Sequence, residues 1–225
     1  MCANDDYNSA AYENGGKFVG WIGVPRDADG NRLSNSQTNP PVTDNDEIRG
    51  IKVGLLYPYV NAAQAYHCPA DNIRKSVYDN TEVFVSYSIP NCLYGEARTN
   101  QPWYSTQIVK HNAISFPEMR YCFVETAETR NWNMSHHFVI AAPEYTGNPE
   151  WGWWGPMAIN HGDSSILGFC DGHAERKIWI DPFTFEHYEK VLNQGGGAYG
   201  QQYPPADQQT DINYMGQGWP YRHKL

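Results

Sequence analysis

Histidines and aspartates gather near the C-terminal third of the chain, and their side chains suit two kinds of chemistry. His161, Asp163 and His173 carry imidazole and carboxylate groups, which bind zinc and move protons in metal-dependent hydrolases. Asp163, Asp171 and Asp181 offer carboxylates from loop positions, which Ca²⁺ prefers. The sequence therefore presents one candidate hydrolytic site and one candidate calcium site, and neither has the fixed spacing of a metal-binding motif.

A predicted hairpin must position these residues. Two strand-like runs flank Asp171 and Gly172, and a two-residue Asp-Gly loop favours a type I′ turn in which both residues have positive φ. Cys170 then pairs with His173 at the end of the hairpin. One face of this hairpin is mostly apolar and is predicted to face the core; it carries Leu167, Phe169, Ala174, Arg176, Ile178 and Ile180.

The rest of the chain predicts an α+β fold built on a largely antiparallel sheet. Strands are expected at 17–24, 82–89, 105–114, 119–126, 136–142, 164–170 and 173–180. Residues 25–47 are mostly turn-forming and predict a long surface loop, followed by short helical turns before Pro69. A helix is expected at 184–193, and the Gly-, Gln-, Pro- and Tyr-rich residues 195–225 are expected to form an extended tail.

Composition limits the function classes. The 225 residues can form a single domain spanning 1–225. A net charge of −9 without basic clusters argues against nucleic acid and anionic membrane surfaces as partners. Only 18 % of residues are charged, whereas there are 16 tyrosines and 8 tryptophans, a balance that suits an exported β-rich protein with long loops. No segment predicts a membrane span or a signal peptide.

The tryptophans support a second function class, a secreted carbohydrate-binding module or adhesin. Trp151, Trp153 and Trp154, with Trp103 and Trp219, could form an exposed platform on which sugar rings stack. Packing in the core is the more common role of such rings. Burial of the rings distinguishes the two interpretations.

Five cysteines allow at most two disulfides within the chain. They are Cys2, Cys68, Cys92, Cys122 and Cys170. None forms a C-x-x-C pair. A Cys122–Cys170 disulfide is expected if the strands that carry these residues are neighbours, and Cys68–Cys92 is the other pairing considered.

Signatures of well-known catalytic sites are absent from the sequence. It contains no G-x-S-x-G, no H-E-x-x-H, no phosphate-binding loop and no dinucleotide fingerprint. Glu125 and Glu128 in "VETAET" are interpreted as an acidic loop at a strand end rather than as the acid/base pair of a glycosidase. No enzymatic activity is therefore expected.

Several short segments occur in an order that is more specific than any one of them. "LYPYV", "HCPAD", "SYSIPN", "FVET", "WWGPMAINH" and "FCDGHAERKIWIDP" follow one another between about residues 50 and 185. Together they resemble the soluble heads of bacterial type II secretion pseudopilin-like, or prepilin-like, proteins with an H-x9-DG signature. The residues that carry the signature are His161, Asp171, Gly172, His173, Trp179 and Asp181.

The resemblance implies a pilin-like head in which an N-terminal helix packs on an antiparallel sheet. Residues 1–16 would be the end of that helix region, 17–194 the head and 195–225 the tail. It implies a non-enzymatic structural subunit at the cell surface or outside the cell, with other pilin or pseudopilin subunits as partners and Ca²⁺ as an occasional ligand. The family's hydrophobic helix is missing from this sequence, as expected for a truncated, processed or separately encoded head.

Overall fold

A five-stranded sheet forms the centre of the protein. The computed structural model describes residues 20–33, 42–72, 82–90, 92–93, 108, 110–127, 137–138, 140–155, 157–194 and 200–220. The strands are β1 (Tyr87–Pro90), β2 (Tyr121–Glu125), β3 (His137–Phe138), β6 (Ser164–Phe169) and β7 (Ala174–Ile178). Their order is β3-β1-β2-β6-β7, and every pair is antiparallel except β1 with β3. The predicted α+β class with a largely antiparallel sheet is confirmed.

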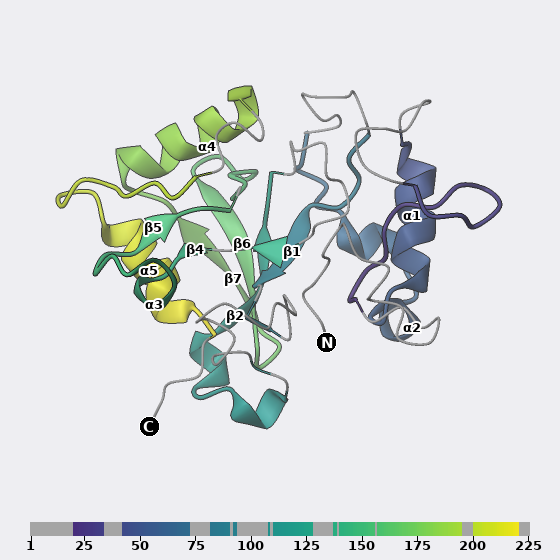
Figure 1. Ribbon diagram of the computed structural model, residues 1–225, viewed down its shortest axis with the longest axis horizontal. Helices are drawn as coiled ribbons and strands as arrows, with labels where there is room; N and C mark the ends of the chain where they lie inside the picture. The colour runs from purple at the N-terminus through teal and green to yellow at the C-terminus, as the bar shows by residue number, and fades with distance from the viewer. Residues whose placement is uncertain are drawn as a thin grey trace.

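Helices cover the sheet from two sides (Figure 1). On one side lie α1 (Asp44–Val53), α2 (Tyr57–Val60) and the 3-10 helix η2 (Ala63–Tyr66). On the other side lie α3 (Pro143–Thr146), α5 (Thr210–Gly218) and a small second sheet of β4 (Ile140–Ala141) and β5 (Gly152–Trp153), with α4 (Pro182–Gln194) along one end. The described residues also include the 3-10 helices η4 (His111–Ala113) and η5 (Pro117–Met119).

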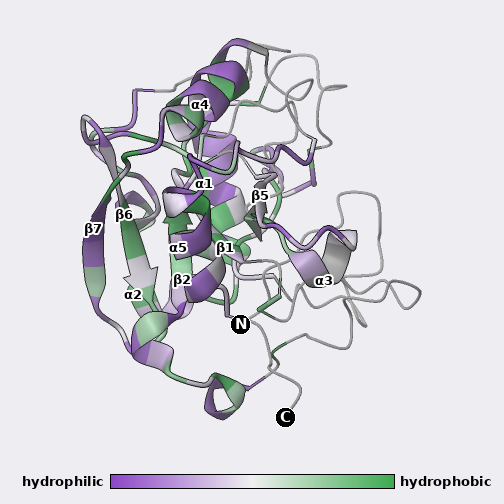
Figure 2. Cartoon of the chain, turned by 90° about the vertical axis from the view of Figure 1, so that its left-hand side faces the viewer, coloured by the Kyte–Doolittle hydropathy of each residue, from purple (hydrophilic) through white to green (hydrophobic). Residues whose placement is uncertain are grey.

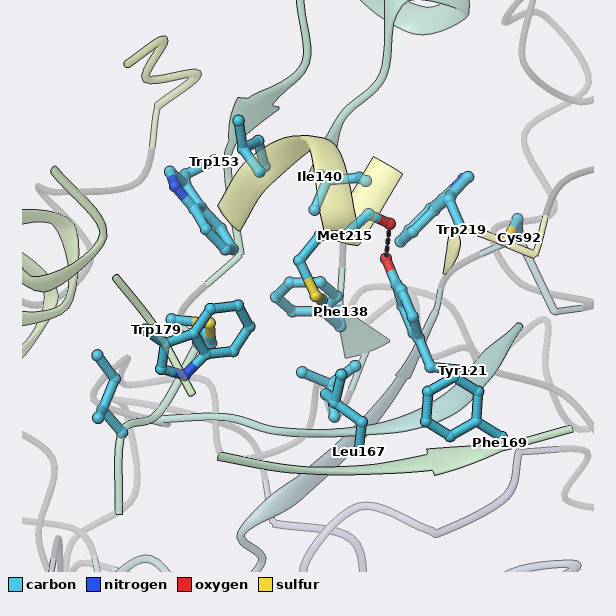
Figure 3. Close-up of a cluster of buried hydrophobic side chains, with 14 residues drawn as sticks. Cys92, Tyr121, Phe138, Ile140, Trp153, Leu167, Phe169, Trp179, Met215 and Trp219 are labelled. Carbon is cyan, nitrogen blue, oxygen red and sulfur yellow. Dashed lines mark hydrogen bonds between the residues drawn. The ribbon is translucent and has the colours of Figure 1, made fainter. Parts of the chain in front are cut away.

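Two hydrophobic clusters correspond to these two sides. The larger combines sheet residues such as Tyr121 and Leu167 with Trp153, Met215 and Trp219 from the C-terminal half (Figure 3). The smaller joins the N-terminal layer to the sheet; its buried members are Trp21, Ile22, Ile51, Ala63, Tyr66, Phe84, Val85, Ile89, Leu93 and Ile108. The described part of the chain therefore forms three layers with the sheet in the middle.

The N-terminal layer differs from the sequence prediction. Residues 20–24, part of the strand expected at 17–24, contain no strand, because their backbone packs directly on α1. The Gly23 N–H donates to the Gly50 carbonyl over 3.0 Å, and a Cβ at Gly50 would lie only 2.5 Å from the Val24 carbonyl oxygen. The loop expected over 25–47 ends early, since α1 begins at Asp44 behind a capping box.

A buried glutamate explains why the strand expected at 82–89 begins only at Tyr87. Glu47 of α1 is 2 % exposed. Its Oε2 accepts the backbone N–H groups of Phe84 at 2.7 Å and Val85 at 3.3 Å. These groups are therefore satisfied by a helix side chain instead of by a neighbouring strand.

Of the other predicted strands, some are present in the structure and others are not. The strand at 119–126 is confirmed by β2, and the one at 136–142 appears as the short β3 and β4. Within 105–114, the described residues 110–114 contain η4 instead of a strand. The helix expected at 184–193 is confirmed by α4, as are helical turns before Pro69.

The predicted extended tail is wrong for residues 210–218, which form α5. Ile212, Met215 and Trp219 are at most 1 % exposed, and the Tyr121 hydroxyl donates to the Met215 carbonyl over 2.9 Å (Figure 3). Ile212 and Met215 lie three residues apart on one face of α5, and Trp219 follows directly after its last residue. The last described helix is therefore part of the core.

The hairpin between β6 and β7 has a three-residue loop instead of the predicted two-residue loop. The Gly172 N–H donates to the Phe169 carbonyl over 3.0 Å, and the Phe169 N–H donates to the His173 carbonyl over 2.8 Å. Within the loop only Gly172 has a positive φ, of 100°. This is a type I turn followed by a left-handed glycine, so the type I′ prediction is wrong.

The additional loop residue reverses the faces of β7. Leu167 opposes Glu175, and a shift of one residue exchanges the two faces of a strand. Ile178 and Ile180 are 49 % and 61 % exposed, whereas Trp179 is buried. The predicted core side is thus confirmed for β6 and wrong for β7, which is a mostly hydrophilic edge strand (Figure 2).

None of the helices in the described ranges is long and apolar enough to span a lipid bilayer.

Candidate functional site

Three potential metal ligands from distant parts of the chain meet in one cluster, formed by Cys68, Glu125 and His161. His161 Nε2 lies 3.0 Å from Glu125 Oε1 and 3.4 Å from Cys68 Sγ. All three ligand atoms lie within 4.8 Å of one another. Sulfur, oxygen and nitrogen donors at this separation are close enough to share one cation.

Hydrogen bonds fix the loop that carries Cys68, which follows η2. The Cys68 N–H donates to Ser86 Oγ over 3.0 Å. Ser86 in turn donates to Asp71 Oδ2 over 2.7 Å. Both Ser86 and Asp71 are buried, so the segment "HCPAD" is tied to the strand segment "SYS" through groups shielded from water.

Glu125 occupies the last position of β2. Its side chain is fully buried, and its two oxygens have different partners. Oε2 accepts the Ile166 N–H from the neighbouring strand at 2.9 Å, whereas Oε1 faces His161. Glu125 therefore lies at the strand end, as predicted, but it belongs to the strand and is buried, so the interpretation of it as part of a loop is wrong.

A tight turn before β6 holds His161. The His161 N–H donates to the Ser164 carbonyl over 3.1 Å, and Ser164 Oγ donates back to the His161 carbonyl over 2.6 Å. Gly162, with φ of 76°, allows the turn. The imidazole is 30 % exposed, so one edge of the cluster is open to solvent.

The environment of the cluster disfavours additional negative charge. Burial, followed by the hydrogen bond to Glu125, raises the pKa of the Cys68 thiol. Burial and the adjacent Cys68 and Glu125 also raise the pKa of the Tyr87 hydroxyl. A bound cation would reverse this effect on the thiol, because its positive charge stabilises the thiolate.

The structure does not bring the predicted calcium ligands together. Asp171 lies in the hairpin loop and bonds His173, whereas Asp163 lies at the other end of β6 and pairs with Arg176 over 3.2 Å. The length of β6 puts these two carboxylates roughly 20 Å or more apart. Asp181 is buried, and its Oδ2 accepts the Asp211 N–H at 2.7 Å.

The predicted hydrolytic site is also separated into two regions. His161 contacts Glu125, whereas His173 lies at the opposite end of β6, where its ring stacks on Phe169 with 4.3 Å between ring centroids. His173 Nδ1 lies 2.6 Å from Asp171 Oδ1. Both His173 and Asp171 therefore stabilise the hairpin end, and His161 belongs to a different site from the one predicted.

Neither of the two cysteine pairs considered is joined by a disulfide, and the fold brings only one of them together. Cys122 and Cys170 are free thiols, as are Cys68 and Cys92. Cys122 of β2 and Cys170 of the adjoining hairpin loop lie side by side, where a hydrogen bond from the Cys122 thiol lowers the pKa of Cys170. Cys68 and Cys92 are not brought together, since Cys92 Sγ donates to the Pro220 carbonyl in the larger core.

Tryptophan burial argues against an exposed stacking platform. Trp153 and Trp219 are fully buried. Trp151 is partly buried and covers Gly216 of α5, where a Cβ would lie 2.5 Å from its ring. Trp154 is also only partly exposed, and Trp103 lies outside the described residues. Trp179, in the H-x9-DG signature, donates from its indole to Ser165 Oγ over 2.7 Å.

Sequence reasoning finds only one member of the cluster. The sequence marks His161 as a candidate ligand, whereas it suggests only a disulfide for Cys68 and only a loop position for Glu125. Both lie in short segments of the ordered set, "HCPAD" and "FVET". The order of these segments is visible in the sequence, and their convergence on one point requires the fold.

Comparisons of the chain with protein-family models, curated proteins and solved structures found no match.

Proposed function

We propose that the chain is the extracytoplasmic head of a pseudopilin-like or type IV pilin-like subunit, which serves in filament assembly and carries out no catalysis. The observation that supports this proposal is the convergence of the resembling segments. Cys68 of "HCPAD", Ser86 of "SYSIPN", Glu125 of "FVET" and His161 of the H-x9-DG signature all belong to one bonded network. A fortuitous set of short matches would have no reason to meet in space.

The way this network is built favours a structural role. Both oxygens of Glu125 contact protein groups, and Ser86 links Cys68 to Asp71. These contacts join the N-terminal layer to β1, β2 and β6, and thus hold the head together. The N-terminal helix that the resemblance implies would end within residues 1–16, which lie outside the described residues, and the mixed α+β architecture with a largely antiparallel sheet is compatible with a pilin-like head.

The other functions considered have less support. An adhesin of the predicted kind would need exposed tryptophan rings, but Trp153 and Trp219 are buried. A hydrolase of the predicted kind would need His161, Asp163 and His173 in one site, but His161 and His173 lie at opposite ends of β6.

Cell-surface shearing with detection by antibody tests the filament role. Filaments are sheared from cells that make the protein, collected by sedimentation and probed for the protein. We expect it in the sheared fraction, together with other pilin or pseudopilin subunits, and immunogold labelling along the filaments. Recovery only from the cell interior, with unlabelled filaments, would rule the proposal out.

A further inference from the structure

We propose that Cys68, Glu125 and His161 bind a divalent cation of the zinc class, with a water molecule as the fourth ligand. This inference concerns the ligand of the cluster and is independent of the filament role. It rests on the donor set, on the separations of its atoms and on the groups that orient them.

The donor set distinguishes this site from a calcium site. Thiolate and imidazole are preferred by Zn²⁺ and related metals, whereas Ca²⁺ takes oxygen ligands only. Cys68 and His161 supply one sulfur and one nitrogen, and Glu125 adds a carboxylate oxygen. Three protein ligands with one open position is a common arrangement for zinc.

The separations need little adjustment. In a tetrahedral site with Zn–S of about 2.3 Å and Zn–N and Zn–O of about 2.0–2.2 Å, ligand atoms lie about 3.3–3.6 Å apart. His161 Nε2 lies 3.4 Å from Cys68 Sγ and 3.0 Å from Glu125 Oε1. These two separations need a change of only a few tenths of an ångström, and the third, between Cys68 Sγ and the Glu125 carboxylate, lies within 4.8 Å. Admitting the cation therefore requires small movements of the partly exposed imidazole and of the Cys68 side chain.

Each ligand is already oriented by a neighbouring group. The Ile166 N–H holds Glu125 Oε2 and thereby directs Oε1 toward His161. Ser86 fixes the Cys68 backbone, and Ser164 fixes that of His161. Such outer contacts typically account for a factor of about 10–100 in metal affinity.

Binding has a defined proton balance. The Cys68 thiol loses its proton to solvent as the metal–sulfur bond forms. The His161 ring proton, which Nε2 shares with Glu125 Oε1 before binding, moves to Nδ1, so that Nε2 presents its lone pair to the cation and Glu125 binds as the carboxylate. One proton is thus released for each Zn²⁺ bound to the neutral-imidazole form.

Co²⁺ added to the reduced, metal-free protein tests the site, because a thiolate ligand gives a sulfur-to-cobalt charge-transfer band. We expect one Co²⁺ to bind per chain with this band and with release of one proton, one Zn²⁺ to displace it without further proton release, and excess Ca²⁺ not to displace it. The Cys68→Ser variant should lose the band and bind at least about 100-fold more weakly.

Two control variants separate this site from the other thiols. Cys92→Ser places a hydroxyl at an equally buried position outside the cluster, and Cys122→Ser disrupts the Cys122–Cys170 thiol pair. Both should retain the band. If Cys68→Ser fails to fold, His161→Gln tests the nitrogen ligand through the affinity, which should fall at least about 10-fold for Co²⁺, and an unchanged affinity would overturn the inference. The absence of a band in the unmodified protein, or its persistence in Cys68→Ser, would overturn the inference.

Discussion

Asp181 and Asp211 each accept a hydrogen bond from the backbone N–H of the other. The Asp181 N–H lies 2.9 Å from Asp211 Oδ2, and the Asp211 N–H lies 2.7 Å from Asp181 Oδ2. Asp181 immediately precedes α4 and Asp211 lies in the first turn of α5. The exchange therefore satisfies an N–H in the first turn of α5 and attaches the C-terminal helix to the segment between the hairpin and α4.

Replacement of Asp211 tests this junction. Its Oδ2 also accepts from Thr184 Oγ1 at 3.0 Å, and its Oδ1 pairs with Lys177 over 3.2 Å. Because these groups are buried, we expect Asp211→Ala to lower the free energy of unfolding by about 3–5 kcal/mol. Urea denaturation measures the loss, and Asp207→Ala, at an exposed position nearby, should change it little. Equal losses in the two variants would contradict the role of Asp211.

The hairpin loop predicts a purely conformational effect at Gly172. Its φ is 100°, and a Cβ added at this position would meet no atom within 4 Å. We expect Gly172→Val to lower the free energy of unfolding by about 1–3 kcal/mol because of backbone strain. Gly172→Asn should cost less, since Asn tolerates positive φ. Unchanged melting temperatures for Gly172→Val would refute the turn geometry.

The Cys122–Cys170 pair predicts selective thiol chemistry. The Cys122 thiol donates to Cys170 and lowers its pKa, whereas the pKa of the buried Cys92 thiol is raised. Iodoacetamide near neutral pH should therefore modify Cys170 well before Cys92. In Cys122→Ala the pH midpoint for modification of Cys170 should rise, because the donor is lost.

Oxidation provides a second readout for the same pair. Oxidised glutathione can accept the two electrons of the dithiol, which becomes a disulfide as two glutathione thiols form. Mass spectrometry without reduction should find Cys122 linked to Cys170. A Cys68–Cys92 link in the folded protein would contradict the structure.

The burial of His187 predicts that the folded state loses stability in mild acid. Burial lowers its pKa from the ordinary 6.5, and its ring stacks on Trp153 with Nε2 directed at the Gly155 carbonyl. Below about pH 6.5 the unfolded chain binds a proton that the folded protein resists, so the folded state loses stability as the pH falls. Above pH 6.5 the contribution of His187 is constant and fully present.

Melting temperatures measured from pH 8 to 5.5 check this effect. In His187→Gln the fall in mild acid should be smaller than in the unmodified protein. The exposed His111 supplies a control, and His111→Gln should retain the full slope. Parallel curves for the unmodified protein and His187→Gln would show that His187 does not contribute.

Local patterns in the sequence identify the elements that depend on local interactions. The β2 and β6 strands and the α4 helix are predictable, because alternation and flanking turn residues determine such segments. The failures involve partners that lie far away in the sequence. Glu47 occupies backbone groups that would otherwise lengthen β1, and one additional loop residue at Cys170 exchanges the faces of β7.

The candidate site shows the same limit. His161 is recognisable because it stands in a family-like signature, whereas Glu125 looks like the edge of an acidic loop. Its burial depends on β6, which supplies the Ile166 N–H, and its contact with Cys68 depends on the N-terminal layer. Neither the burial of Glu125 nor its contact with Cys68 can be recognised from the spacing of residues along the chain.

The position of α5 in the core also sets the order of events during synthesis. Met215 and Trp219 cover Tyr121 and its neighbours on β2 and β6. At about 5–20 residues per second, translation from Phe169 to Trp219 takes roughly 3–10 s. During that interval the apolar face of the sheet lacks the side chains that cover it in the folded protein, so the core is completed only when the last described helix has been made.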